Sequence, residues 1–170
     1  WAQLGARDSL WPGSWFWGEI SPSGAQVAYI RLPVGHTYTP APDEFYLPPY
    51  EIWTARSDGS QASRIGRCYR ARQIIWFDQE RKIIFDCGYE GPSAVIIASV
   101  DGSSAEYLND VTAFRGSLGW GSMALSPDET ILALTDAVGR LQIVPLDGSP
   151  IQHIAQWGVV SAWSPDSRRL

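Results

Sequence analysis

The 170-residue sequence predicts an all-β fold, a β-propeller fragment of about three and a half four-stranded antiparallel blades. Its 16 glycines and 12 prolines suit a chain with many tight turns, and its nine Trp and seven Tyr suit strands. Two short phrases alternate along the chain, one built around Ser-Pro and one around Asp-Gly-Ser. Their spacing brackets the roughly 40–45 residues of a four-stranded propeller blade.

The first phrase is an apolar residue followed by Ser-Pro, an Asp or Ser, and then an apolar strand. It occurs at 20–24, 125–129 and 163–167, and a degenerate copy with Phe-Asp-Gln occupies 76–80. Proline fixes φ near −65° and suits the second residue of a tight turn, while Ser and Asp side chains bond free backbone N–H groups. Each copy predicts a turn between the first two strands of a unit, with less support at 76–80.

The second phrase is an apolar strand that ends in Asp-Gly-Ser. Its glycines are Gly59, Gly102 and Gly148, which lie 43 and 46 residues apart. Asp-Gly supplies the positive φ that hairpin turns need. This phrase therefore predicts the turn between the third and fourth strands of each unit.

The two phrases together divide the chain into units at about 15–66, 72–109, 119–155 and, incompletely, 158–170. The second strands of the first three units are short apolar runs, which suits strands buried on both faces; these runs are 27–30, 83–85 and 131–134. A β-sandwich of ordinary hairpins is the alternative, but the regular alternation of the phrases favours the propeller. A propeller that does not close leaves open edges, so we expect the chain to be part of a longer protein that supplies the remaining blades.

These phrases resemble the repeats of the TolB-type, or WD40-like (PD40), propeller family. The family's blade reads Trp-Ser-Pro-Asp-Gly, an apolar strand, and then an Ile-Trp or Ile-Tyr strand that ends in Asp-Gly. The resemblance covers nearly all of the chain from Trp15 onward, and unit two departs from it at 77–79. It implies a non-catalytic scaffold that binds a protein or peptide, in the periplasm or outside the cell, with the cytoplasm not excluded.

Residues 31–50 form a long insertion between the second and third strands of unit one, and long loops in compact domains are often functional. In propellers such loops share a face with the connections between units, here about 66–72, 109–119 and 155–159. Aromatic and arginine side chains, the types enriched in binding hot spots, gather on this loop face. The predicted binding residues are His36, Tyr38, Phe45, Tyr46, Arg67, Arg70, Arg72 and Arg115. The alternative is that the loop only packs over the rim.

Catalytic and metal chemistry have little support in the sequence. His36 and His153 stand far apart, no Gly-x-Ser-x-Gly segment occurs, and no His/Cys set has zinc spacing, so no catalytic residue, metal or cofactor is predicted. The net charge of −5 argues against nucleic acid, and no apolar run is long enough for membrane insertion. Two enzyme-linked alternatives stay open: the propeller domain of a prolyl-oligopeptidase-like serine peptidase whose catalytic domain lies outside this chain, and a propeller polysaccharide lyase.

Two further features leave alternatives open. Cys68 and Cys87 could form a disulfide in an oxidising compartment or remain two buried thiols, and the sequence favours the thiols. Trp11, Trp15 and Trp17 could form a platform for sugar stacking, but packing between blades is the favoured explanation.

Overall fold

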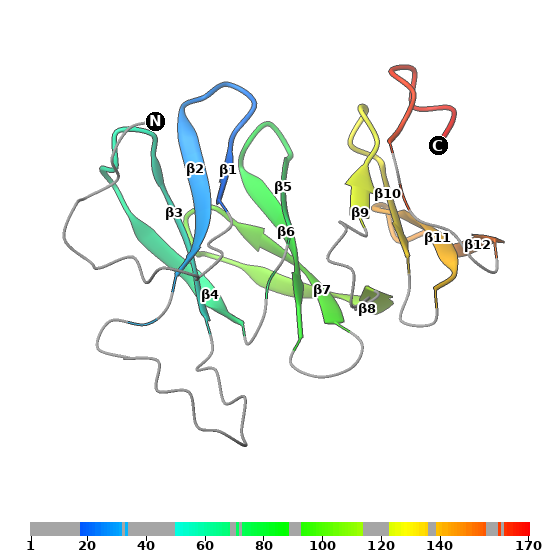
Figure 1. The fold of residues 1–170 in the computed structure, drawn as a ribbon, viewed down its shortest axis with the longest axis horizontal. Helices are drawn as coiled ribbons and strands as arrows, with labels where there is room; N and C mark the ends of the chain where they lie inside the picture. Colours follow the sequence, from blue (N-terminus) through cyan, green and yellow to red (C-terminus); the bar gives the residue numbers. More distant parts are fainter. Residues whose placement is uncertain are drawn as a thin grey trace, which may run out of the picture.

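The computed structural model describes residues 18–31, 33, 50–68, 71, 73–88, 93–113, 123–135, 139–155, 160 and 162–170. Within these ranges the chain forms twelve β-strands and no helix. The strands make three separate four-stranded sheets, in which each strand pairs antiparallel with its neighbour in the chain (Figure 1). The predicted all-β fold of repeated four-stranded antiparallel units is confirmed.

The three sheets follow one another in chain order (Figure 1). Sheet I contains β1 (Gly18–Ile20), β2 (Gln26–Arg31), β3 (Tyr50–Arg56) and β4 (Ser63–Cys68). Sheet II contains β5 (Ile74–Phe77), β6 (Lys82–Cys87), β7 (Ser93–Ser99) and β8 (Ala105–Ala113). Sheet III contains β9 (Met123–Leu125), β10 (Ile131–Thr135), β11 (Leu141–Pro145) and β12 (Gln152–Ala155).

The Ser-Pro phrases form the turns between the first and second strands of sheets I and III. At the β9–β10 turn the Ser126 hydroxyl donates to Asp128 Oδ1 at 2.6 Å and accepts the Ile131 N–H at 3.0 Å. The same pair of contacts joins Ser164 to Asp166 at 2.6 Å and to the Arg169 N–H at 2.9 Å. The side chains thus satisfy backbone groups that the turn leaves unpaired. The degenerate phrase of sheet II also makes a turn, closed by the Arg81 N–H on the Asp78 carbonyl at 3.1 Å.

The three Asp-Gly-Ser phrases form the predicted hairpin turns. Gly59, Gly102 and Gly148 have φ of 82°, 75° and 84°. In each turn the carboxylate of the preceding aspartate accepts the N–H of the following serine, at 2.8–2.9 Å; the aspartates are Asp58, Asp101 and Asp147. The turn type therefore follows directly from the sequence.

Residues with positive φ join the first turn of each unit to the first turn of the unit before it. Glu80, Glu129 and Ser167 have φ of 63°, 60° and 58°, an unfavourable conformation for residues with a Cβ atom. Each of the three side chains accepts a backbone N–H from the turn of the preceding sheet. Glu80 binds the N–H and hydroxyl of Ser23, the hydroxyl at 2.6 Å. Glu129 accepts the Asp78 N–H at 2.7 Å, and Ser167 accepts the Asp128 N–H at 3.1 Å.

Tryptophan side chains make a second repeated contact, between successive units. Trp76 on β5 donates its indole N–H to the Glu19 carbonyl on β1 at 3.0 Å. Trp163, at the same place in its own phrase, donates to the Ala124 carbonyl on β9 at 2.9 Å. Between sheets II and III this place is held by Leu125, which has no donor. There the Gln73 side chain instead bonds both the N–H and the carbonyl of Met123, at 3.2 and 2.7 Å.

The core lies between the sheets, because the second strands of sheets II and III are apolar on both faces and β2 is apolar on its face toward sheet II. On β6, Ile83 and Phe85 pack against Ala28 and Ile30 of sheet I. Ile84 points the other way and packs in a second cluster with sheet III, whose members from that sheet are Met123, Leu132, Leu134 and Val144. The prediction that 83–85 is buried on both faces is confirmed, since these residues are 0–3% exposed.

A disulfide joins Cys68 at the end of β4 to Cys87 at the end of β6, with their Cα atoms 5.4 Å apart. The sequence favoured two unpaired thiols, and that expectation is wrong. The pairing was not predictable from the sequence because β4 and β6 belong to different sheets, and their ends meet only once sheet I packs on sheet II. The disulfide therefore links the first sheet covalently to the second.

Candidate functional site

Of the eight predicted binding residues, Arg67 is the one that lies within the described ranges. It lies in strand β4 rather than in the connection after it, and its side chain is 60% exposed. The other seven lie outside the described residues; they are His36, Tyr38, Phe45, Tyr46, Arg70, Arg72 and Arg115. The tryptophans at 11, 15 and 17 also lie outside the described residues. Arg67 and its neighbours are therefore the part of the predicted site that the structure describes.

Arg67 belongs to a cluster of three arginines around one buried carboxylate. Glu51, on β3, has a side chain that is 7% exposed, and its closest ion pairs are with Arg64 Nη1 at 3.2 Å and Arg31 Nε at 3.3 Å. Arg67 Nη2 lies 3.8 Å from Glu51 Oε1. The Trp53 indole N–H also donates to Glu51, at 3.0 Å, and its ring lies 3.8 Å from the guanidinium carbon of Arg31. We call these five residues the arginine cluster.

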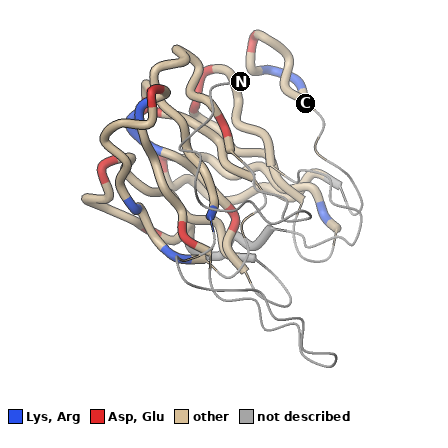
Figure 2. Tube along the Cα trace, turned by 60° about the vertical axis from the view of Figure 1, so that its left-hand side comes forward, with Lys and Arg blue, Asp and Glu red and all other residues tan. Residues whose placement is uncertain are grey.

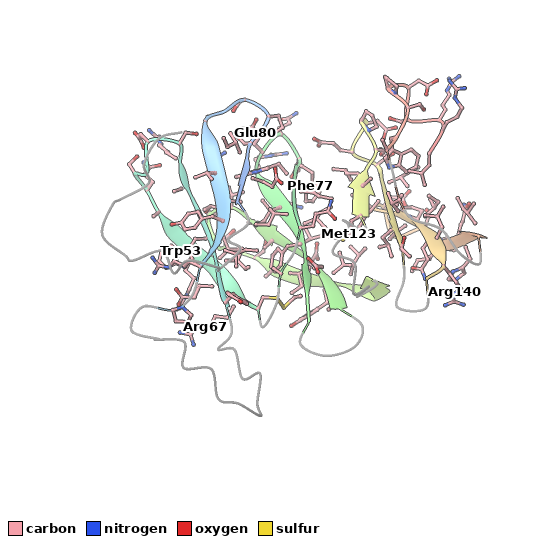
Figure 3. The ribbon with its side chains drawn as sticks, viewed as in Figure 1. Trp53, Arg67, Phe77, Glu80, Met123 and Arg140 are labelled. Atoms are coloured by element: carbon pink, nitrogen blue, oxygen red, sulfur yellow. A yellow bond between two sulfur atoms is a disulfide. The ribbon has the colours of Figure 1, made fainter. Side chains whose placement is uncertain are left out.

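Strand register explains why these side chains converge. Arg31 and Arg67 are the direct cross-strand partners of Glu51, and Arg64 is the partner of Trp53. Paired residues, and residues two apart on one strand, point to the same face of a sheet. Figure 3 labels Trp53 and Arg67 on this part of sheet I, and Figure 2 shows Lys and Arg interspersed with Asp and Glu along the trace.

The cluster holds Glu51 in its charged form. Burial alone would raise the pKa of Glu51, but hydrogen bonds from Trp53, Arg64 and Arg31 outweigh it and lower the pKa below its ordinary value. Three guanidinium groups against one carboxylate leave an excess of positive charge, on a chain whose net charge is −5. This is a surface suited to binding anionic groups.

Sequence reasoning found only Arg67 of the arginine cluster. A usable signal was present, because Glu51 stands in the otherwise apolar start of a central strand. A buried carboxylate almost always has charged or hydrogen-bonding partners. What the sequence lacked was the register that brings Arg31 and Arg64, on different strands, to the same carboxylate.

A shallow groove between β5 and β9 is lined mainly by Gln73, Ile75, Met123 and Leu125, with Glu129 as its one titratable group. Within the described ranges, no three His, Cys, Asp or Glu side chains are grouped so that they could hold a metal ion. In that same part of the chain, no helix is long and apolar enough to cross a membrane.

The comparisons with known proteins concern the fold. No family model matches the sequence, and no curated protein matches it. Among solved structures, TolB from Acinetobacter baumannii aligns with a TM-score of 0.59 at 9% identity, over 86% of this chain. The β-propeller domain of the Trilobed protease from Pyrococcus furiosus, described as having an open velcro topology, aligns with a TM-score of 0.53 at 13% identity, over 83% of this chain. The fold is a β-propeller.

Peptidases are also among the structures similar to this propeller. A puromycin-hydrolyzing peptidase from Mycobacterium tuberculosis aligns with a TM-score of 0.59 at 19% identity, over 80% of this chain. The propeller described here spans 34% of the TolB chain, 43% of the Trilobed protease domain and 21% of the peptidase. At these identities the likeness concerns the fold alone.

Proposed function

We propose that this chain is part of a TolB-like propeller scaffold without catalytic residues of its own, which binds a protein or peptide through its loop face. The partner is a polypeptide rather than a nucleic acid, and the chain itself does not insert into a membrane. The observation that carries the proposal is the arginine cluster, which brings three exposed or half-exposed arginines and a tryptophan together on sheet I. Arg and Trp are the side chains enriched in binding hot spots.

We further propose that the protein works in the cell envelope or outside the cell. The disulfide between Cys68 and Cys87 supports this location, because disulfides persist in oxidising compartments and are rare in the cytosol. A thiol-trapping experiment on protein taken directly from its native cells tests the location. Complete resistance to alkylation without prior reduction supports it, and two free thiols would contradict it.

The binding role is tested with a partner first identified by cross-linking and mass spectrometry. The triple variant R67A/R70A/R72A should bind the purified partner at least about tenfold more weakly, because it removes three arginines that are predicted to contact the partner. The variant R56A/R81A/R168A removes the same charge elsewhere and serves as the matched control. Equal affinities of both variants and the unchanged protein would argue against the loop face as the binding surface.

The second candidate is the propeller domain of a prolyl-oligopeptidase-like serine peptidase, and the alignment with the puromycin-hydrolyzing peptidase favours it. In that case the nucleophile belongs to a separate domain of a longer chain. Sequencing the gene across both ends of the 170-residue segment distinguishes the scaffold from the peptidase domain. A Gly-x-Ser-x-Gly segment on the same chain supports the peptidase, and further propeller repeats alone support the scaffold.

A further inference from the structure

The junction between sheets II and III differs from the junctions before and after it. Trp76 of unit two donates to the Glu19 carbonyl of unit one, and Trp163 of unit four donates to the Ala124 carbonyl of unit three. Between units two and three the same place holds Leu125, whose side chain has no hydrogen-bond donor. Of these three consecutive junctions, the middle one therefore lacks the indole ring and its N–H group.

Strand register identifies the carbonyl that has no indole donor. Glu19 and Ala124 stand directly before the first turn phrase on β1 and β9, and Ile75 stands at the same place on β5. A carbonyl oxygen has two lone pairs, so it can accept an indole N–H as well as a bond within its sheet. The Ile75 carbonyl receives no such bond from the following unit, because the residue there is Leu125.

The groove between β5 and β9 lies at the place that the ring leaves open, since Ile75 and Leu125 both line it. Trp76 and Met123 add further apolar surface, and Figure 3 labels Met123 on the β9 side of this junction. The groove has a volume of about 390 Å³, within the roughly 300–1,000 Å³ of small-ligand sites. Aliphatic side chains and a methionine sulfur are favourable surroundings for an aromatic ring.

The polar groups of the groove favour a ligand that donates hydrogen bonds and carries positive charge. Among the described residues that line it, Glu129 is the one with a charge. Its carboxylate accepts the Asp78 N–H, and a carboxylate has capacity for further donors. The amide of Gln73 and the hydroxyl of Ser126 are already bonded within the protein. The groove thus offers acceptors and negative charge beside an apolar surface.

We propose that this groove binds the indole ring of a tryptophan in a partner polypeptide, next to a basic residue of the same polypeptide. The ring lies against Met123 and Leu125 and donates its N–H to the Ile75 carbonyl, as the tryptophans at the other two junctions do to their acceptors. The neighbouring positive charge meets Glu129. The groove contains none of the eight predicted loop-face residues, so this site is additional to the proposed binding role and its failure would leave that role standing.

The probe is the peptide acetyl-Lys-Trp-Lys-amide, titrated into the full-length protein with isotope-labelled methionine methyl groups. Met123 is the one methionine of the 170-residue sequence, and Met123→Leu assigns its signal. The peptide should shift this signal saturably. The same peptide with a methyl group on the indole nitrogen should bind about fivefold more weakly, as expected for the loss of one hydrogen bond. Acetyl-Glu-Trp-Glu-amide should also bind several-fold more weakly, by a ratio that falls as salt is added.

Two substitutions test the groove itself. Leu125→Trp supplies the missing ring from the chain's own strand, so it should abolish peptide binding, whereas Ile154→Trp adds a tryptophan at an exposed place on β12 and should leave binding unchanged. Glu129→Gln keeps an acceptor for the turn but removes the charge, so it should abolish the preference for the Lys peptide over the Glu peptide. Glu106→Gln, on the exposed part of β8, should retain that preference. If Leu125→Trp fails to fold, Glu129→Gln and the methylated peptide decide.

Several results would overturn the proposal. They are an unshifted Met123 signal, equal binding of the methylated peptide, an unchanged peptide preference in Glu129→Gln, and undiminished binding by a folded Leu125→Trp variant. Tryptamine that binds as tightly as the peptide would assign the groove to a free small molecule instead. Nuclear Overhauser contacts in the unliganded protein between the Met123 methyl group and an indole other than that of Trp76 would assign it to one of the chain's own tryptophans.

Discussion

Substitutions at Glu129 test the contacts between turns. Ala usually leaves a protein more stable than Gly does, and at this position we expect the reverse. Glu129 lies in the β9–β10 turn with a φ of 60°, and its carboxylate accepts the Asp78 N–H from the preceding sheet at 2.7 Å. Its side chain thus joins two sheets while its backbone occupies an unfavourable region. Replacement by Ala removes the contact and keeps the strain, whereas replacement by Gly removes both.

The magnitudes follow from these two terms. A hydrogen bond to a charged group contributes about 1.5–3 kcal/mol, which exposure to water reduces here to about 1 kcal/mol. A left-handed conformation costs a non-glycine residue about 1–2 kcal/mol, and the greater freedom of Gly in the unfolded chain offsets about 0.5–1 kcal/mol of the relief. Glu129→Ala should therefore destabilise the protein by about 1 kcal/mol. Glu129→Gly should change the free energy of unfolding by less than about 0.5 kcal/mol.

Urea unfolding followed by circular dichroism measures both variants. Glu106 on β8 is the matched control, since it is exposed and has ordinary strand geometry. At Glu106, Gly should be less stable than Ala by roughly 0.5–1 kcal/mol, which is the usual order in a strand. The reasoning is refuted if Ala is as stable as Gly at position 129, because then neither the strain nor its relief contributes.

Three other predictions follow from the contacts between and within the sheets. Trp76→Phe should lower the free energy of unfolding by about 1–2 kcal/mol, because the Glu19 carbonyl loses its indole donor; an unchanged urea midpoint would show that water replaces it. Cys68→Ala/Cys87→Ala opens a cross-link of sequence separation 19 and should cost about 3 kcal/mol in the same assay, whereas a variant as stable as the unchanged protein would contradict that role. Hydrogen bonds from neighbouring serines lower the pKa of the turn aspartates. These bonds therefore stabilise the folded protein at neutral pH, and their stabilisation is lost below about pH 4 as the carboxylates become protonated. A melting temperature that stays constant from pH 6 to pH 2.5 would contradict this. The aspartates concerned are Asp58, Asp101, Asp128, Asp147 and Asp166.

The turns were predictable because their determinants are local. An Asp-Gly-Ser phrase carries within three residues both the positive φ and the carboxylate that closes the turn, as Gly102 and Asp101 show. The Ser-Pro phrases are similar, and their repetition revealed the number of strands in each unit. Local chemistry repeated at a fixed period was enough to predict the architecture.

The contacts between sheets were not predictable, because they join residues whose proximity depends on the register of several strands. Glu80 lies in the degenerate turn phrase, but nothing in that phrase indicates that its side chain bonds the neighbouring turn at Ser23. Cys68 and Cys87 meet only when sheet I packs on sheet II. The arginine cluster has the same origin, since Arg31 and Arg64 approach Glu51 from two different strands.

The bridging glutamates distinguish the blades of this propeller from one another, although their outlines repeat. Sheet II and sheet III each offer a carboxylate to the sheet before them, but the same position in sheet I is Gly24, which has no side chain to offer. A copy of sheet I inserted after sheet II would therefore leave the Asp78 N–H without its acceptor. Gene duplication or laboratory shuffling that gives the first module an upstream neighbour would therefore lose this contact, and a Glu or Ser at the position of Gly24 could restore it.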